Sequence, residues 1–424
     1  MKIVILSIMA WLAMERGPAH AAAFTAGNVV VYRVGTGTGS LLTAATPVFL
    51  DEFAPGGALV QSIALPVAVA GAQRRFTASG TATSEGSLQR SADRQHLTFT
   101  GYDADAGTTG VATSTVASVP RVVGFADRNA VIDTTTAVTA FSANNIRSAV
   151  SDDGTGAWVC GGTSGVVYVG RGGSGTFTTV SSSSNNNRSI DIADGQLFFS
   201  SGSGTFRLAQ VGTGSPKTSG HTSLPVSGGP VSTASPYQFT MLDLDAAVPG
   251  ADTLYAADDT AGTGGIQKYC LNSGTWEARG NVAGGGEVTG IRGLTAAAQG
   301  GTVTLYATTS IRLVSLTDSS GYNGTLAGSF AVLASAAANT GFRGIDFAPV
   351  AAVPPAPALA IARSGGTVVV SWPSSAAPAW VLQQKENLAS GPWLPSIGVT
   401  DNGSVKSLTL PTAAARQFFR LAFP

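Results

Sequence analysis

Histidine and cysteine are almost absent from this chain, whose 424 residues include three histidines and two cysteines. A zinc or copper site needs several such ligands close together, and a Ser-His-Asp triad needs a histidine between its partners. His96 and His221 lie far apart in the sequence, so we expect neither to be catalytic and no metal site to form. Cys160 and Cys270 are also distant, and we expect two buried free thiols rather than a disulfide.

Charge is scarce as well, because only 11% of the residues are Asp, Glu, Lys or Arg and their sum is zero. Nucleic-acid binding depends on many basic contacts to phosphate, so no nucleic-acid partner is expected. No cofactor-binding motif is present either. Beyond the N-terminus, no stretch is apolar for long enough to form a transmembrane helix.

The N-terminus resembles a secretory signal. Lys2 gives a short positive region, residues 3–14 are apolar, and Ala19-His20-Ala21 is a small-x-small cleavage site. We therefore expect residues 1–21 to be a signal peptide, and the mature protein to be secreted, periplasmic or held at the cell surface.

Glycine, by contrast, is abundant, with 54 residues among many Ser, Thr, Ala and Val. This composition favours short strands joined by tight turns. A strand signal recurs six times at intervals of 41 to 57 residues, and five of the six carry an arginine followed by Ser or Gly. Repeats of this length are typical of solenoids, propellers and related arrays. The six segments are Leu88–Asp93, Ile146–Val150, Arg188–Asp191, Tyr237–Met241, Ile291–Leu294 and Phe342–Asp346.

The first five repeats each continue into further strands, whereas the sixth has none after it. The N-terminus supplies three unmatched strands at Val29–Val34, Val48–Phe53 and Leu59–Leu65. A last inner strand that completes a sheet begun at the N-terminus closes a ring and hides two sheet edges. The sequence therefore predicts an all-β, six-bladed propeller at residues 24–348 with such a clasp. It becomes seven-bladed if the stretch between Arg90 and Arg147 holds two short blades.

A different composition follows the repeats. Residues 349–357 form a proline-alanine linker that cannot join a sheet interior. Residues 358–424 show strands with period-two alternation, including Thr367–Trp372 and Trp380–Gln384. We expect a small β-sandwich with a tryptophan in its core.

Two resemblances rest on particular phrases. Residues 24–347 resemble a family of secreted, largely uncharacterised bacterial β-propeller proteins, through Gly27–Gly35, Val48–Phe53, Gly80–Gly86 and Asp252–Asp259. The tail resembles the fibronectin- or immunoglobulin-like module at the C-terminus of many exported bacterial proteins, through Val369–Pro373, Gly391–Trp393 and Phe418–Leu421. Both resemblances imply fold and export, and neither implies a catalytic constellation.

The arginines are the one set of residues with a repeated geometry. If the repeated strands line a channel, the arginines stand at one level around its axis and form a ring at one mouth. Guanidinium groups at such a ring suit a carboxylate, a sulfate or an acidic sugar. The alternative is structural, since five unpaired like charges repel strongly and each arginine can instead pair with the neighbouring blade. The candidate binding residues are Arg90, Arg147, Arg188, Arg292 and Arg343.

Acidic residues offer a second chemistry. A glycosidase needs two carboxylates across a sugar, and nothing in the sequence selects a pair among Glu85, Asp93, Asp191, Asp243, Asp245, Glu287 and Asp346. Asp103-Ala-Asp105-Ala-Gly107 resembles the start of a calcium loop but lacks its later ligands, and turn chemistry explains it equally well.

We therefore expect an exported, non-catalytic binding or adhesion protein whose propeller loops or channel mouth recognise an extracellular glycan or protein. The alternatives are a polysaccharide lyase or glycoside hydrolase and a structural component of the envelope. The sequence leaves the question of enzyme activity open and leans against it.

Overall fold

The computed structural model describes residues 21–231, 233–286, 288–352, 356–374, 380–388, 393–412 and 417–422. The expected signal peptide thus lies outside the described residues, apart from Ala21. The described residues form strands and one short 3₁₀ turn at Val111–Thr113, without an α-helix. None of them forms a helix that is long and apolar enough to cross a membrane. The chain divides into two compact units between Ala351 and Ala352.

The first unit consists of antiparallel strands in groups of four, as in the blades of a β-propeller. Five groups follow the chain, with the first strand of each innermost. They are β5 (Gln89–Arg90), β6 (His96–Tyr102), β7 (Arg121–Asp127) and β8 (Ile132–Val138); β9 (Ile146–Val150), β10 (Gly156–Gly161), β11 (Val166–Gly170) and β13 (Thr178–Ser181); β14 (Asn187–Ala193), β15 (Gln196–Ser201), β16 (Leu208–Val211) and β17 (Ser223–Pro225); β18 (Pro236–Leu242), β19 (Thr253–Asp258), β20 (Gly265–Asn272) and β21 (Thr275–Ala283); and β22 (Gly293–Gln299), β23 (Thr302–Thr308), β24 (Arg312–Asp318) and β25 (Ala331–Ser335).

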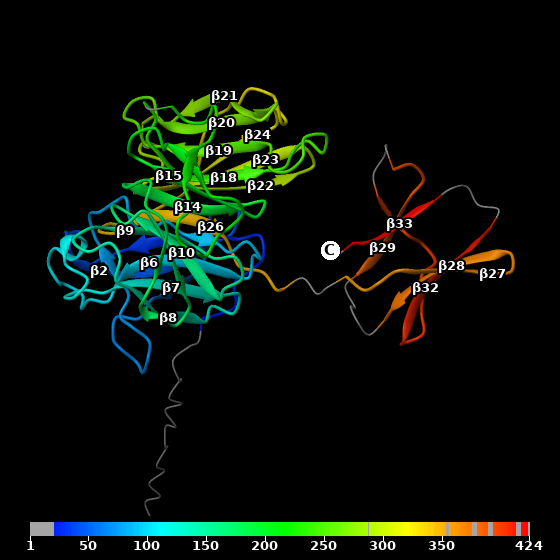
Figure 1. Cartoon of the computed structure of the whole chain (residues 1–424), viewed down its shortest axis with the longest axis horizontal. Coiled ribbons are helices and arrows are strands. Elements are labelled where there is room, and N and C mark those ends of the chain that lie inside the picture. Colours follow the sequence, from blue (N-terminus) through cyan, green and yellow to red (C-terminus); the bar gives the residue numbers. More distant parts are fainter. Residues whose placement is uncertain are drawn as a thin grey trace, which may run out of the picture. The chain divides into compact units, whose positions relative to one another are not determined.

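The remaining group joins the two ends of this unit. Its strands run in the order β26 (Gly341–Phe347), β1 (Val29–Val34), β2 (Ala45–Phe53) and β3 (Leu59–Ala64). In Figure 1, β26 in orange lies beside the blue strands of the N-terminus, and the register pairs Val29 with Phe347 and Val34 with Gly341. The pairing of the first strand with the last is the one that the repeat count predicts. Short β4 (Thr77–Ser79) bridges β2 and β6, and β12 (Ser174–Gly175) pairs with β8.

The strands are buried on both faces because each sheet packs between two neighbours. In β1, Val30 and Tyr32 contact the core shared with Phe99 of the next group. Val29 and Val31 face the opposite way, into the core that holds Leu313 and Ile345. This alternation places every second side chain in a different intersheet core, so nearly all of β1 is apolar.

The innermost strands lie side by side in succession, from β5 through β9, β14, β18 and β22 to β26, which lies beside β5 again. Buried polar contacts also join the groups. Lys268 of β20 forms an ion pair of 2.8 Å with Asp318 of β24, and the Tyr255 hydroxyl donates to the same carboxylate at 2.6 Å. Both charges of this ion pair are almost fully buried, so removing one would leave the other unpaired at high cost.

The second unit has two sheets. One orders β27 (Ala360–Ser364), β28 (Thr367–Pro373), β32 (Val405–Pro411) and β31 (Thr400–Asp401), and the other orders β30 (Leu394–Pro395), β29 (Val381–Lys385) and β33 (Phe418–Ala422). Their shared core holds buried Val370, Trp372, Leu382 and Leu408. The expected tryptophan is therefore Trp372.

Candidate functional site

Four of the five predicted arginines share one level of the inner strands. The backbone N–H that follows this level donates to the carbonyl at the same level of the next strand: Ser87 to Arg147, Gln238 to Arg292, and Gly344 to Gly86, at 2.9 to 3.1 Å. Side chains repeat the pattern, since Ser200 donates to the carbonyl of Tyr237 and Thr308 to that of Arg343. The level therefore consists of Gly86, Arg147, Arg188, Tyr237, Arg292 and Arg343.

Arg90 is the exception and corrects the predicted ring. In the first repeat the equivalent position is Gly86, and Arg90 lies four residues further along, at the opposite end of the inner strands. There its backbone N–H donates to Asp346 at 2.7 Å and its guanidinium lies 5.4 Å from the centre of the Phe347 ring. Gly86 cannot be an arginine, because it has φ of +77° and a Cβ there would lie 2.8 Å from Tyr32.

The four remaining arginines bind their neighbours. Arg147 donates to Asn186 Oδ1 at 2.7 Å and to the Asn187 carbonyl at 3.3 Å, in the next group. Arg188 likewise donates to the Ser235 hydroxyl at 2.6 Å.

Arg292 forms an ion pair of 2.6 Å with Asp259, which lies 3.8 Å from Arg188. The Tyr237 ring lies between Arg188 and Arg292, with centroid distances of 4.3 and 4.9 Å. Arg343 donates to the Gly80 carbonyl at 2.9 Å. These contacts join adjacent groups of strands, as the structural alternative requires.

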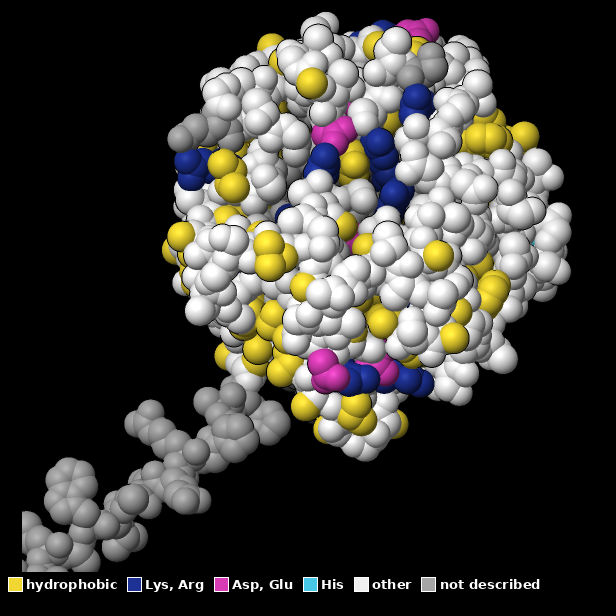
Figure 2. Space-filling model, turned by 90° about the vertical axis from the view of Figure 1, so that its left-hand side faces the viewer, with side chains coloured by type: hydrophobic (Ala, Val, Ile, Leu, Met, Phe, Trp, Pro, Cys, Tyr) yellow, Lys and Arg dark blue, Asp and Glu magenta, His cyan; other side chains and the backbone are white. Residues whose placement is uncertain are grey.

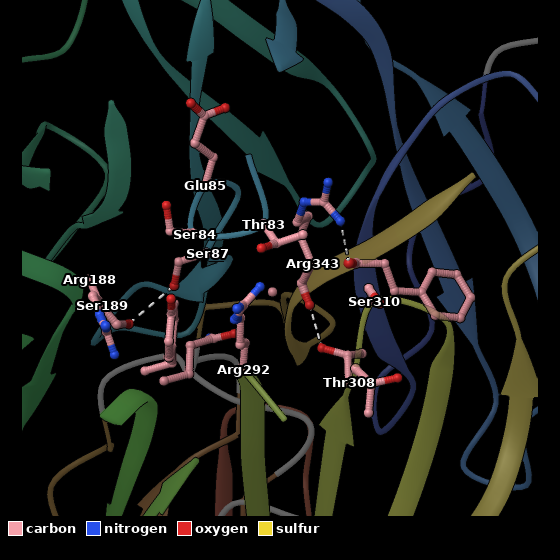
Figure 3. A pocket seen from close by; sticks show the side chains of 15 residues that line it. Thr83, Ser84, Glu85, Ser87, Arg188, Ser189, Arg292, Thr308, Ser310 and Arg343 are labelled. Carbon is pink, nitrogen blue, oxygen red and sulfur yellow. Dashed lines mark hydrogen bonds between the residues drawn. The ribbon is translucent and has the colours of Figure 1, made fainter. Parts of the chain in front are cut away.

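A narrow cavity lies at this level, and we call this end of the channel the arginine mouth. Arg188, Arg292 and Arg343 line it together with Glu85, and Figure 3 shows Arg292 near its middle. Its volume is about 20 Å³, whereas a single water needs about 10–15 Å³. A sulfate or a sugar does not fit in this space. Figure 2 shows basic side chains around a hollow on one face of the molecule, with acidic ones beside them.

Glu85 is a buried carboxylate of the arginine mouth. It accepts hydrogen bonds from the Tyr102 hydroxyl at 2.6 Å and from the Ser79 backbone N–H at 3.2 Å. Burial raises its pKa in spite of these bonds and of nearby Arg343. Burial also lowers the pKa of Arg343 to about 10, because Glu85 compensates only part of the lost hydration.

Glutamine side chains cross the channel in its middle. Gln238 of β18 donates to the carbonyls of Leu88 at 2.7 Å and Ile345 at 3.1 Å, and accepts from the Ile345 N–H at 3.0 Å. Gln89 donates to the Ser189 hydroxyl at 2.7 Å. These bonds join strands that are not neighbours, so the two mouths of the channel are separate cavities.

The other end holds a cavity of about 360 Å³, which we call the aspartate mouth. Three residues beyond the arginine level, the inner strands carry Gln89, Val150, Asp191, Thr240, Thr295 and Asp346. All of these except Val150 line the cavity, and so do Arg90 and Arg94. Asp191 belongs to the third group and Asp346 to the sixth. Both carboxylates line this cavity, and Asp346 is close enough for its charge to act on Asp191, so the structure brings together a carboxylate pair that the sequence could not select.

The two carboxylates have different surroundings. Asp346 accepts from the Arg90 and Phe347 backbone N–H groups, both at 2.7 Å, and from the Thr295 hydroxyl at 2.9 Å. Asp191 accepts one described bond, from the Ile192 N–H at 2.8 Å. Burial raises the pKa of Asp191 well above its ordinary value, and the charge of Asp346 raises it further. The arrangement favours the protonated form of Asp191 in the shared cavity.

The other candidate residues have ordinary roles. Asp103 and Asp105 both pair with Arg75, at 2.8 and 2.7 Å, which explains the Asp-Ala-Asp segment without calcium. No group of three or more potential metal ligands occurs among the described residues.

Cys160 and Cys270 are buried free thiols, as predicted. Burial lowers the pKa of His96, and His221 contacts the Thr218 hydroxyl at 3.0 Å. Glu287 lies outside the described residues.

No protein-family model matches the chain, and no curated protein does. Similar solved structures include a protein named as a 6-phosphogluconolactonase of Bacteroides uniformis, at 12% identity and a TM-score of 0.42, over 92% of this chain and 99% of that one. They also include a gluconolactonase of Xanthomonas campestris, at 10% and 0.36 over 82% and 95%. A third is the β-propeller domain of Swd1 from Myceliophteria thermophila, at 10% and 0.35 over 63% and 97%. The strand pairing within this chain defines its fold.

Proposed function

We propose that the chain is an exported binding protein built on a closed, six-bladed β-propeller, with the C-terminal β-sandwich as a spacer or surface module. The six successive inner strands and the pairing of β1 with β26 support closure of the ring. The apolar N-terminus and its small-x-small site support export.

Two truncations test the closure. A chain that ends at Asn339 lacks β26, so β1 loses its inner neighbour and we expect no cooperative unfolding transition. A chain that ends at Ala351 keeps β26 and should unfold with nearly the midpoint of the propeller in the full chain. Equal stability of the two truncated chains, measured by thermal circular dichroism, would contradict the clasp.

We place the ligand at the aspartate mouth. Its volume of about 360 Å³ is within the range of small-molecule sites. Arg90 and Arg94 are matched by Asp194 and Asp346, since the proton held by Asp191 removes its charge, so the site favours neither an anion nor a cation. Carboxylates accept hydrogen bonds from hydroxyl groups, and guanidinium groups donate to them. The observation that carries the proposal is that two carboxyl groups, of Asp191 and Asp346, line one cavity together with the guanidinium groups of Arg90 and Arg94. This combination supports a neutral, hydroxyl-rich ligand such as a sugar unit.

A glycan array of neutral and acidic oligosaccharides, followed by calorimetric titration of the strongest binder, tests this site. We expect neutral glycans to bind. Asp346→Asn should raise the dissociation constant by about tenfold or more, since hydrogen bonds to charged groups contribute about 1.5–3 kcal/mol. Glu277→Gln on outer strand β21 serves as the control and should bind normally. Binding that is unchanged by Asp346→Asn would place the ligand elsewhere.

Hydrolysis is a second candidate, favoured by the raised pKa of Asp191 near Asp346. A protonated Asp191 can give its proton to the leaving oxygen as the glycosidic bond breaks, while a water molecule that loses its proton to Asp346 adds to the anomeric carbon of the sugar. Chromogenic aryl glycosides test this step. If it occurs, Asp191→Asn should lower turnover by about a hundredfold or more while binding persists. A wild-type protein that binds these glycosides without turnover is a binding protein only.

A further inference from the structure

Positive charge is in excess around the arginine mouth. Arg188, Arg292 and Arg343 line its cavity, and Glu85 is the acidic residue among the lining residues. Asp259 compensates one further charge, although it pairs with Arg292 and Arg188 together. Arg147 stands at the same level and is close enough to Arg188 for the two charges to disfavour one another. Four guanidinium groups therefore share two carboxylates among the described residues.

Two guanidinium donors at this level also have no described acceptor. They are the Nε groups of Arg147 and Arg343, whose side chains are more than nine-tenths buried. A buried charged donor without an acceptor is costly, so a bound water or ion at this level is favoured. Of these two arginines, Arg343 lines the cavity.

The size of the cavity selects the acceptor. A volume of about 20 Å³ exceeds the roughly 10–15 Å³ that a water molecule needs, and it admits one compact body somewhat larger than water. A water molecule supplies an acceptor but leaves the excess charge, and the oxyanions and acidic sugars suggested by the arginine series are too large. We propose that the arginine mouth binds a single monatomic anion of the size of chloride, which holds the arginines of neighbouring blades together. This site is separated by Gln89 and Gln238 from the ligand site at the aspartate mouth.

Bromide provides a direct test, because it resembles chloride and scatters anomalously. Crystals of the full chain grown or soaked in sodium bromide should show an anomalous peak in the cavity between Arg188, Arg292 and Arg343. An ordered water there without an anomalous peak, or bromide bound only at other places, would overturn the proposal.

A solution measurement tests the effect of the anion on stability. At fixed ionic strength, replacing sodium gluconate by sodium chloride should raise the unfolding midpoint of the full chain by about 3 °C, and the rise should saturate. Arg292→Gln should abolish the chloride-dependent part, and Arg188→Gln serves the same purpose if the first variant does not fold. Arg279→Gln on outer strand β21 is the matched control and should keep the full response. Equal midpoints of the wild type in the two salts would contradict the site.

Discussion

The two mouths of the channel are built from the same six inner strands, yet they handle charge in opposite ways. At the arginine mouth, the repeated basic side chains are held by carbonyls, hydroxyls and Asp259, and a cavity of about 20 Å³ remains. At the aspartate mouth, the equivalent positions differ from strand to strand and leave about 360 Å³. The recurring residue thus joins the blades, whereas the varied positions three residues later are free to form a ligand site.

The largest expected effect tests whether the arginine mouth is structural. Gly86→Ala adds a Cβ 2.8 Å from Tyr32 at φ of +77°, and should reduce the free energy of unfolding by about 3 kcal/mol. Gly27→Ala is the control, because Gly27 has φ of +87° and no atom near its Cβ position; it should lose about 1 kcal/mol. Urea unfolding measures both. Equal losses would mean that the close approach at Gly86 contributes nothing.

A pair of arginine substitutions compares the mouths directly. Arg343→Gln removes the bond to the Gly80 carbonyl from a buried site and should cost about 2 kcal/mol of unfolding free energy. Arg90→Gln removes a single long bond, 3.5 Å to the Ala348 carbonyl, and should cost less than about 1 kcal/mol. Denaturant titration of both variants gives the comparison. A larger loss for Arg90→Gln would reverse the roles that we assign to the two mouths.

The smallest effect is a dependence on pH at the aspartate mouth. Since the pKa of Asp191 is higher in the folded protein than in the unfolded chain, the folded state holds its proton more tightly. Wild-type stability should therefore fall relative to Asp191→Asn as the pH rises above about 4, the ordinary range of aspartate. At neutral pH, the Asp191→Asn variant should be more stable than the wild type by about 1 kcal/mol, and near pH 3 the difference between the two proteins should be smallest. Unfolding curves across this range measure it, and a constant difference would show that Asp191 titrates normally.

Much of the strand order could be predicted from sequence. Five of the six residues of Val29–Val34 are buried and apolar, which predicts a strand with these bounds, and the lack of further repeat strands after Phe342–Asp346 predicts its partner. The outer strand β17, at Ser223–Pro225, is only three residues long and carries no alternation that would place it. Outer strands bury little side-chain surface, so their sequences carry a weaker signal.

The candidate site was less predictable. Arg90 precedes a serine just as Arg147 and Arg188 do, so the pattern aligns it with them, although Gly86 holds that position. Glycine gives no periodic signal, and its role depends on contacts with Tyr32 of β1 and with Arg343 of β26. The presence of Asp191 and Asp346 in one cavity depends on how their groups of strands are arranged and on the register of those strands. Neither can be obtained from the spacing of two residues in a sequence.

The shared sheet of β1 and β26 has a consequence for the order of events during synthesis. β1 leaves the ribosome among the first strands, but its inner neighbour is translated only at the end of the propeller sequence. Until then, β1 to β3 remain without their inner edge partner, and the nascent chain cannot complete its native ring. The export that we propose requires a chain that stays unfolded while it crosses a translocation channel, and this dependence on the last strand would delay folding until transit is nearly finished.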